Sequence, residues 1–198
     1  MKETYIRFMA SVNPQTTDQL FKIVDQKIKE KYEKIHLMIS SPGGSVFHGL
    51  TLYNFLKGAP IEVDTYNFGS VDSIGVVIFC SGKRRYCVPH ARFLIHGLSL
   101  QMNGNFEEKQ IEEQLKGMKI DKENIARVIS DTTSKPLHNI EDDMNNRTTL
   151  NPTQAKDYGL VHEIKSNLFP IDADISVIGD SIQPQIPMQI PFQIPVIK

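Results

Sequence analysis

Two stretches of the chain, GSVDSIGVVIFC at residues 69–80 and FLIHG at residues 93–97, decide the fold that we expect. In the first stretch, Ser73 precedes a run that is apolar almost throughout, and such a run predicts a buried element. As a helix, this run places Ser73 at its first turn, above the positive end of the helix dipole. In the second stretch, His96 ends an apolar strand. Serine and histidine are the two side chains that a nucleophile and its general base require.

A glycine-rich turn lies upstream, in the sequence SPGGS at residues 41–45. It follows an apolar strand predicted at residues 35–39 and precedes a helix predicted at residues 46–56, which Gly58 closes. A turn of this form exposes backbone N–H groups, and such groups stabilise the oxyanion of a tetrahedral intermediate. Each signal is weak by itself, because a serine before a helix is commonly an N-cap and a Pro-Gly-Gly turn is commonly only a turn.

The remaining pattern alternates strands with helices, which favours an α/β domain with a parallel sheet. A strand at residues 5–9 leads through Asn13-Pro14 into an amphipathic helix, where Thr16 and Gln19 resemble a capping box. Gly69 and Ser70 are expected to end a strand. The other expected strands lie at residues 61–66, 84–88, 91–96 and 160–164, and a short helix at 151–159.

A long polar helix is predicted from Asn105 to about Asp131, with Glu108 in the position of an N-terminal cap. Its apolar residues form an intermittent stripe among many Glu and Lys side chains. The helix is too polar for a core and too apolar to be surrounded by water, so the pattern favours contact with a helix of another subunit.

The composition is that of an ordinary globular protein, with 198 residues, 40% hydrophobic and 23% charged content, and a net charge of −1. The length suits one domain, and the balanced charge gives no electrostatic reason to expect nucleic acid or an anionic membrane as partner. Cys80 and Cys87 lie in apolar surroundings without metal-ligand spacing. We therefore expect reduced thiols, no metal ion, no membrane insertion and a cytoplasmic location.

Residues 167–198 depart from this pattern, so we place the boundary of the globular domain at residue 166. Between residues 185 and 196 the motif Gln-Ile-Pro recurs every four residues. Proline at this frequency excludes a helix or a central strand, which predicts an extended tail. The composition is typical of a disordered end, whereas the many apolar residues favour docking in a groove of the same or a neighbouring subunit.

Together, the motifs resemble the proteolytic subunit of the Clp protease over about residues 5–164. Four motifs occur in the family's order: SPGGS (41–45), SIG (73–75), IH (95–96) and AKDYGLV (155–161). The resemblance implies an α/β, crotonase-like spiral of ββα units with a protruding handle helix. It also implies a homo-oligomer of stacked heptameric rings that hydrolyses peptides or unfolded proteins in an inner chamber, without a cofactor.

Position by position, the resemblance makes Ser73 the nucleophile and His96 the general base. It assigns the oxyanion hole to the backbone N–H groups of Gly44 and Ile74. The aspartate of the family's triad falls at Arg147, which cannot accept a hydrogen bond from the imidazole. A local shift would bring Asn146 or Asp143 into that role, and the sequence does not decide between them.

Two further departures concern partners and substrates. The family's N-terminal segment, which helps to engage an AAA+ unfoldase, is not found before the first strand, and this weakens the expectation of such a partner. Asp72 stands beside the nucleophile where the family has small uncharged residues. We interpret it either as a solvated charge or as a group that selects peptides.

Three functional hypotheses follow from these observations. The first is a serine endopeptidase of the Clp type. The second is a non-catalytic or catalytically weakened ring subunit, which Arg147 favours. The third is another crotonase-fold enzyme that acts on an acyl-CoA, and such an enzyme would use the oxyanion donors without a Ser-His pair.

Overall fold

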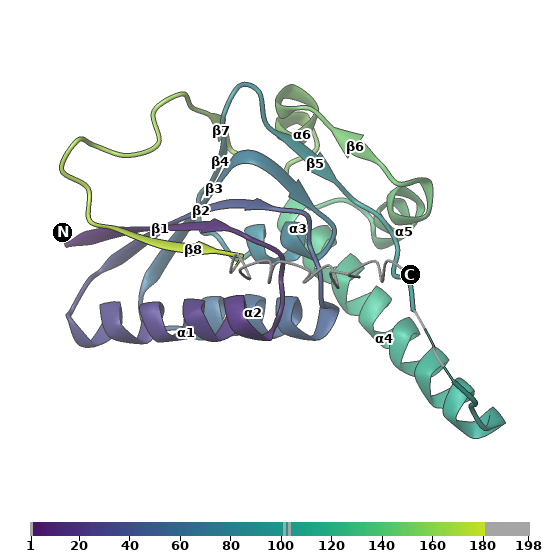
Figure 1. The fold of residues 1–198 in the computed structure, drawn as a ribbon. Coiled ribbons are helices and arrows are strands. Elements are labelled where there is room, and N and C mark those ends of the chain that lie inside the picture. Colours follow the sequence, from purple (N-terminus) through teal and green to yellow (C-terminus); the bar gives the residue numbers. More distant parts are fainter. Residues whose placement is uncertain (1, 101, 103, 181–198) are drawn as a thin grey trace, which may run out of the picture.

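The computed structural model describes residues 2–100, 102 and 104–180, which form the mixed α/β fold expected from the sequence (Figure 1). Strands and helices alternate in the first half of the chain, and helices dominate the second. In chain order the elements are β1 (Glu3–Met9), α1 (Pro14–Lys29), β2 (Lys34–Ser41), α2 (Val46–Gly58), β3 (Glu62–Asp72), α3 (Ile74–Phe79), β4 (Arg85–Cys87), β5 (Arg92–Leu94), α4 (Glu108–Thr133), α5 (Leu137–Asn146), β6 (Thr149–Leu150), α6 (Pro152–Asp157), β7 (Glu163–Ile164) and β8 (Ile175–Gly179).

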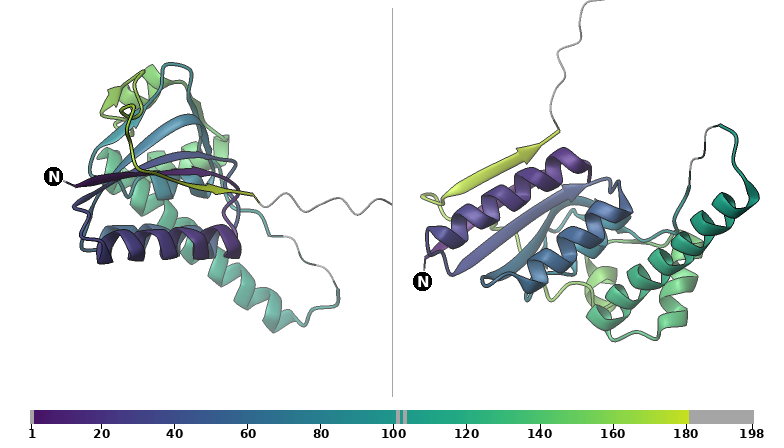
Figure 2. Two further views of the ribbon diagram at one scale, coloured as in Figure 1. Left: turned by 60° about the vertical axis from the view of Figure 1, so that its left-hand side comes forward. Right: turned by 90° about the horizontal axis from the view of Figure 1, so that it is seen from below.

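One sheet organises the domain, with the strand order β6-β5-β3-β2-β1-β8; in addition, β4 pairs with β3, and β7 pairs with β4. Among the described strands, every pair is parallel except β5 with β6. The helices α1 and α2 lie side by side along one face of the sheet (Figures 1 and 2). They provide the crossover connections that parallel neighbours require.

The core lies between this sheet and its helices. In β1, buried and more exposed residues alternate, as in a strand with one covered face. In β2, five successive residues are buried, as in a central strand that is covered on both faces. The largest fully buried side chains come from the strands, the crossover helices, α3 and the residue after β5: Ile6, Phe8, Leu20, Ile35, Leu37, Met38, Ile39, Leu52, Ile74, Phe79, Phe93 and Ile95.

The strand β3 corrects one sequence prediction, because Gly69 and Ser70 do not end it. The strand continues to Asp72, pairing first with β4 and then with β5. Ser70 lies opposite Arg92 in the second pairing. The ladder with β5 therefore overrides the low strand propensity of glycine, and tertiary pairing commonly has this effect.

Two predicted helix starts and one strand end also differ. At α1 the capping box joins Asn13 and Thr16: Asn13 Oδ1 accepts from the Thr16 N–H at 3.0 Å, and Gln19 has no part in it. At α4 the cap is Glu107, paired with Gln110. β5 ends at Leu94, so His96 lies in the segment that follows the strand.

The strand β8 lies beyond the expected domain boundary at residue 166 and was not predicted. It pairs in parallel with β1, with Tyr5 opposite Ile175, and the Ile178 side chain is fully buried. Residues 175–179 therefore belong to the same sheet as the rest of the domain. The Gln-Ile-Pro repeat at residues 185–196 lies outside the described residues, and the extended tail there stays a prediction.

The long helix α4 projects away from the sheet, as the resemblance to a handle helix predicts (Figures 1 and 2). Its C-terminal part packs on the domain through the buried side chains of Ile125, Ala126 and Ile129. Its N-terminal part carries half-exposed Ile111 and Leu115. Assembly of rings through this helix remains a prediction. In the described part of the chain, no helix combines the length and apolarity needed to cross a membrane.

Candidate active site

Ser73 occupies the tight connection between β3 and α3. Its backbone has a φ of 58° and a ψ of −130°, a conformation that residues other than glycine rarely adopt. The Ser73 N–H donates to Leu94 O at 2.8 Å, and all six residues of α3 behind it are buried. A strained backbone conformation persists only where the surrounding structure maintains it, and such conformations are common at functional sites.

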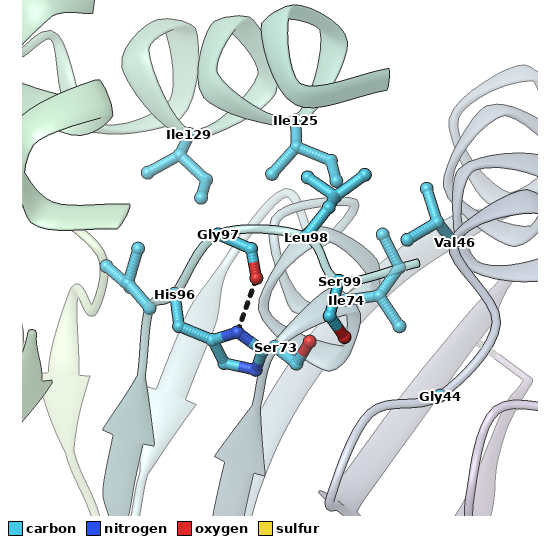
Figure 3. A pocket seen from close by; sticks show the side chains of 11 residues that line it. Gly44, Val46, Ser73, Ile74, His96, Gly97, Leu98, Ser99, Ile125 and Ile129 are labelled. Atoms are coloured by element: carbon cyan, nitrogen blue, oxygen red, sulfur yellow. Dashed lines mark hydrogen bonds between the residues drawn. The ribbon is translucent and has the colours of Figure 1, made fainter. Parts of the chain in front are cut away.

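The serine side chain faces a small pocket of about 80 Å³ (Figure 3). One wall comes from α4, through Ile125 and Ile129, and Gly44 and Val46 line another side. The complete lining consists of Gly44, Val46, Ser73, Ile74, Ile95, His96, Gly97, Leu98, Ser99, Ile125 and Ile129. All four residues assigned to catalysis and to the oxyanion hole are in this set.

His96 reaches the pocket from the segment after β5. On one side of it, the Ile95 N–H donates to Thr148 O at 2.9 Å, and on the other side the Gly97 N–H donates to Met144 O at 2.8 Å. The ring nitrogen Nδ1 lies 2.6 Å from the carbonyl oxygen of Gly97, and the other ring nitrogen is on the side of Ser73 (Figure 3). The backbone around His96 is thus tied to the end of α5 and the residue before β6.

At the candidate oxyanion hole, the backbone leaves no room for a side chain at residue 44. Gly44 has a φ of 144°, and a Cβ atom there would lie 2.3 Å from Val12 O. The neighbouring peptide groups are engaged with Val12, whose N–H donates to Gly43 O at 2.7 Å and whose carbonyl accepts from the Ser45 N–H at 2.8 Å. Within the described residues, the N–H groups of Gly44 and Ile74 have no hydrogen-bond partner, so they are available to an oxyanion.

None of the residues considered for the third triad position forms a hydrogen bond with His96. The Asp143 carboxylate is engaged elsewhere: Oδ1 accepts from Thr148 Oγ1 at 2.8 Å, and Oδ2 accepts from the Tyr158 hydroxyl at 2.6 Å. Burial, together with this carboxylate, raises the pKa of Tyr158 well above its ordinary value. Asn146 and Arg147 are exposed at the end of α5, where Arg147 adopts the left-handed conformation of a C-cap.

Asp72, next to the nucleophile, is mostly buried and paired with neighbouring groups. Its Oδ2 accepts from Arg92 Nη2 at 2.8 Å, and its Oδ1 accepts from Ser70 Oγ at 2.8 Å. It lines a separate hollow with Arg92 and Ser40, outside the pocket of Ser73. The interpretation as a solvated charge is therefore wrong.

In the described part of the chain, no cluster of three or more His, Cys, Asp or Glu side chains is placed to hold a metal ion. Cys80 and Cys87 are free and buried, and burial raises the pKa of each thiol to about 11. Thiols with such pKa values are poor nucleophiles at neutral pH. Ser73 therefore remains the candidate nucleophile of the pocket.

Sequence reasoning missed two features of this site. One is the Gly97 carbonyl beside His96, and the other is the hydrogen-bonded group formed by Asp143, Thr148 and Tyr158. A main-chain carbonyl leaves no mark in a sequence. The Tyr158 in the motif at residues 155–161 was a visible signal for the second feature, because a buried tyrosine hydroxyl usually has a hydrogen-bond partner.

The chain is similar to known proteins in both sequence and structure. A model of the family described as Clp protease matches residues 1–167. The chain is 33% identical over 152 residues to the chloroplastic ATP-dependent Clp protease proteolytic subunit 3 of Arabidopsis thaliana, covering 76% of this chain and 48% of that protein. It is 33% identical over 132 residues to the ATP-dependent Clp protease proteolytic subunit 1 of Corynebacterium jeikeium, covering 66% of this chain and 69% of that protein.

Among solved structures, a mutant of ClpP1 from Listeria monocytogenes is similar, with a TM-score of 0.75 and 25% sequence identity. The superposition covers 82% of this chain and 91% of that chain. The sequence match spans about half of the chloroplast relative and about two thirds of the bacterial one. The strand β8 lies beyond the residues that the family model matches.

Proposed function

The chain belongs to the Clp protease family, and from this premise we propose that it is a serine-type endopeptidase. The observation that carries the proposal is the meeting, in one pocket, of Ser73, His96 and the N–H groups of Gly44 and Ile74. The family membership gives no support to the hypothesis of an acyl-CoA enzyme, which would not need the Ser-His pair.

In the proposed mechanism, the Ser73 hydroxyl attacks the carbonyl carbon of a peptide bond while His96 accepts the hydroxyl proton at Nε2. The negative oxygen that develops is held by the Gly44 and Ile74 N–H groups. His96 then gives the proton to the departing amine, which leaves an ester on Ser73. A water molecule, deprotonated by His96, cleaves this ester and restores the free hydroxyl.

The proposed substrates are peptides and unfolded proteins, and the proposed assembly is a homo-oligomeric ring in which α4 contacts other subunits. The half-exposed apolar side chains on α4 support such contacts, since an apolar stripe on a projecting helix favours burial against another helix. The relatives are named as subunits of an ATP-dependent protease, which supports a separate ATPase as a partner.

A specific observation favours a second candidate, a ring subunit with weak or no activity. The resemblance places Arg147 at the position of the triad aspartate, and no carboxylate of the described residues forms a hydrogen bond with the His96 imidazole. In other triads, replacement of the carboxylate by an amide lowers the rate by about 10⁴-fold. The two candidates share the fold and assembly and differ in whether Ser73 reacts.

A fluorophosphonate probe separates them, because it forms a covalent bond only with an activated serine. We expect labelling of the purified protein at Ser73 and loss of labelling in Ser73→Ala and His96→Ala. Ser99→Ala is the matched control, since Ser99 lines the same pocket and has no role in the mechanism. An unlabelled protein whose oligomer is intact by gel filtration would exclude the endopeptidase and leave the second candidate.

A further inference from the structure

The imidazole of His96 has one hydrogen-bond partner among the described residues, and this partner is the main-chain carbonyl of the next residue. Nδ1 lies 2.6 Å from Gly97 O (Figure 3). A carbonyl oxygen only accepts hydrogen bonds, so Nδ1 must carry the proton. In the neutral ring the other nitrogen, Nε2, then has a free lone pair. Since Nε2 is on the side of Ser73, this tautomer is the one that a general base requires.

The backbone that leads to the Gly97 carbonyl is held by hydrogen bonds on both sides of His96. The Gly97 N–H donates to Met144 O at 2.8 Å, and two residues earlier the Ile95 N–H donates to Thr148 O at 2.9 Å. Both acceptors lie at the end of α5 or just after it, so two anchors flank His96. The Gly97 carbonyl belongs to the peptide group that follows the second anchor, so the chain is fixed up to the residue that carries it.

Among the described residues, no side chain near His96 accepts the hydrogen bond from its Nδ1–H. Asp143 already accepts from Thr148 and Tyr158. Asn146 and Arg147 are exposed, and neither lines the pocket. The carbonyl of Gly97 is therefore the acceptor that faces His96 without competition from a carboxylate.

We propose that the Gly97 carbonyl is the positioning group of this active site, taking the place of the triad carboxylate by holding His96 in the Nδ1–H tautomer. The proposal rests on the proposed function of Ser73 and His96. When His96 takes the serine proton at Nε2, its Nδ1–H bond to Gly97 O is kept, and the resulting imidazolium is stabilised by a dipole instead of a full charge. The chain therefore has an oriented base whose imidazolium is stabilised less than it would be beside a carboxylate.

The tautomer is measurable without any activity assay. In a ¹⁵N solid-state NMR spectrum of the histidine-labelled protein, protonated and unprotonated ring nitrogens give well-separated signals. His96→Gln identifies the His96 signals among those of the six histidines. We expect a protonated Nδ1 and an unprotonated Nε2. A resting His96 with its proton on Nε2 overturns the proposal, whatever the activity.

A backbone ester tests the carbonyl directly. Replacing Leu98 by its α-hydroxy acid turns the amide between residues 97 and 98 into an ester, which makes the Gly97 carbonyl a weaker acceptor. The Leu98 N–H that is removed has no hydrogen-bond partner among the described residues. We expect labelling of Ser73 by the probe to slow about fivefold, as for the loss of one ordinary hydrogen bond. The Nδ1–H population should fall as well.

The matched control is an ester one residue later, between Leu98 and Ser99, which weakens a carbonyl that accepts no hydrogen bond from the described residues. Labelling and tautomer should be unchanged in this control. Equal slowing by both esters, or slowing without a change of tautomer, overturns the role of Gly97. By contrast, an Nδ1–H tautomer in a protein that the probe does not label overturns the endopeptidase proposal and leaves the orientation of His96 standing.

Discussion

Gly43 lies so close to Ser73 that no side chain fits between them. A Cβ atom at residue 43 would be 2.6 Å from the Ser73 Cβ and 2.9 Å from Asp72 O. The Gly43 backbone also has a φ of 89°, which strains any other residue. The turn before α2 and the turn before α3 therefore hold each other, and this contact brings the Gly44 N–H to the pocket of the serine.

Gly43→Ala should accordingly displace the oxyanion donors relative to the nucleophile. We expect probe labelling of Ser73 to slow by about 10²-fold or more, in line with the loss of one oxyanion donor. Gly117→Ala in α4 is the control, because a Cβ atom there meets no neighbour within 4 Å. The control should be neutral or slightly more stable, by about 0.5–1 kcal/mol. Equal labelling rates for the two variants would show that the close approach of Gly43 to Ser73 does not position the site.

Arg147→Asp should speed the reaction of Ser73. The resemblance places the triad aspartate at residue 147, which lies between Met144 and Thr148, whose carbonyls accept from the backbone on either side of His96. Aspartate also tolerates the left-handed conformation of this position. Because the Gly97 carbonyl already orients the ring, we expect a gain of about tenfold, well below the roughly 10⁴-fold effect seen in triads without another acceptor.

The rate of probe labelling measures this gain, and Arg147→Asn is the control, since it removes the positive charge without adding a negative one. The Asn variant should react at the rate of the unmodified protein. A gain of the same size in both variants would mean that removal of the arginine charge is responsible, and the carboxylate would then have no part in it.

Asp174 should make the stability depend on pH. Hydrogen bonds from Lys27 and Tyr32 lower its pKa to about 2. Because the pKa is lower in the folded protein, the stabilisation is present above the ordinary value near 4 and is lost as the pH falls through about 2. The carboxylate is partly exposed, so we expect Asp174→Asn to lower the free energy of unfolding by only about 1 kcal/mol at neutral pH.

Denaturant unfolding at several pH values checks this expectation, and the difference between Asp174→Asn and the unmodified protein should shrink below about pH 4. Asp172→Asn is a suitable control, since Asp172 is exposed and forms no ion pair with the described residues. A difference that stays constant down to low pH would show that the carboxylate charge does not provide the stabilisation.

Tyr158→Phe should loosen the packing of α6 against α5. The variant removes the hydroxyl that donates to Asp143 Oδ2 and leaves a carboxylate with one partner fewer. Hydrogen bonds to charged groups contribute about 1.5–3 kcal/mol, and we expect a loss in this range in thermal or denaturant unfolding. Tyr53→Phe should cost much less, because the Tyr53 hydroxyl has no hydrogen-bond partner in the described part of the chain. Similar losses of stability in both variants would show that the hydrogen bond between Tyr158 and Asp143 does not stabilise the protein.

The strand β8 should contribute to the stability of the whole domain. Ile178→Ala removes a fully buried side chain and should lower the free energy of unfolding by about 2–5 kcal/mol. Val177→Ala, on the same strand with a side chain that is 54% exposed, should have a small effect. If both variants unfold like the unmodified protein, β8 is not part of the cooperative core.

Local patterns were sufficient for much of the fold and for the candidate nucleophile and base. The apolar run after Ser73 predicted α3, and the glycine-rich turn at residues 41–45 predicted the start of α2, because both depend on residues close together in the chain. The motif order also placed Ser73, His96, Gly44 and Ile74 in one site, and the structure brings them to one pocket. Their catalytic roles stay predictions.

The sequence by itself determined the order of most elements, and it supplied these four residues as candidates for the site. Only the tertiary structure decided what faces His96, how Asp143 is used, and where residues 175–179 lie. The reason is physical: a main-chain carbonyl has no sequence signal, and the contacts involved join distant residues. Tyr158 and Asp143 are 15 positions apart, and Thr4 and Asp174 are 170 positions apart. Such contacts form only when the packed sheet and helices bring the two partners together.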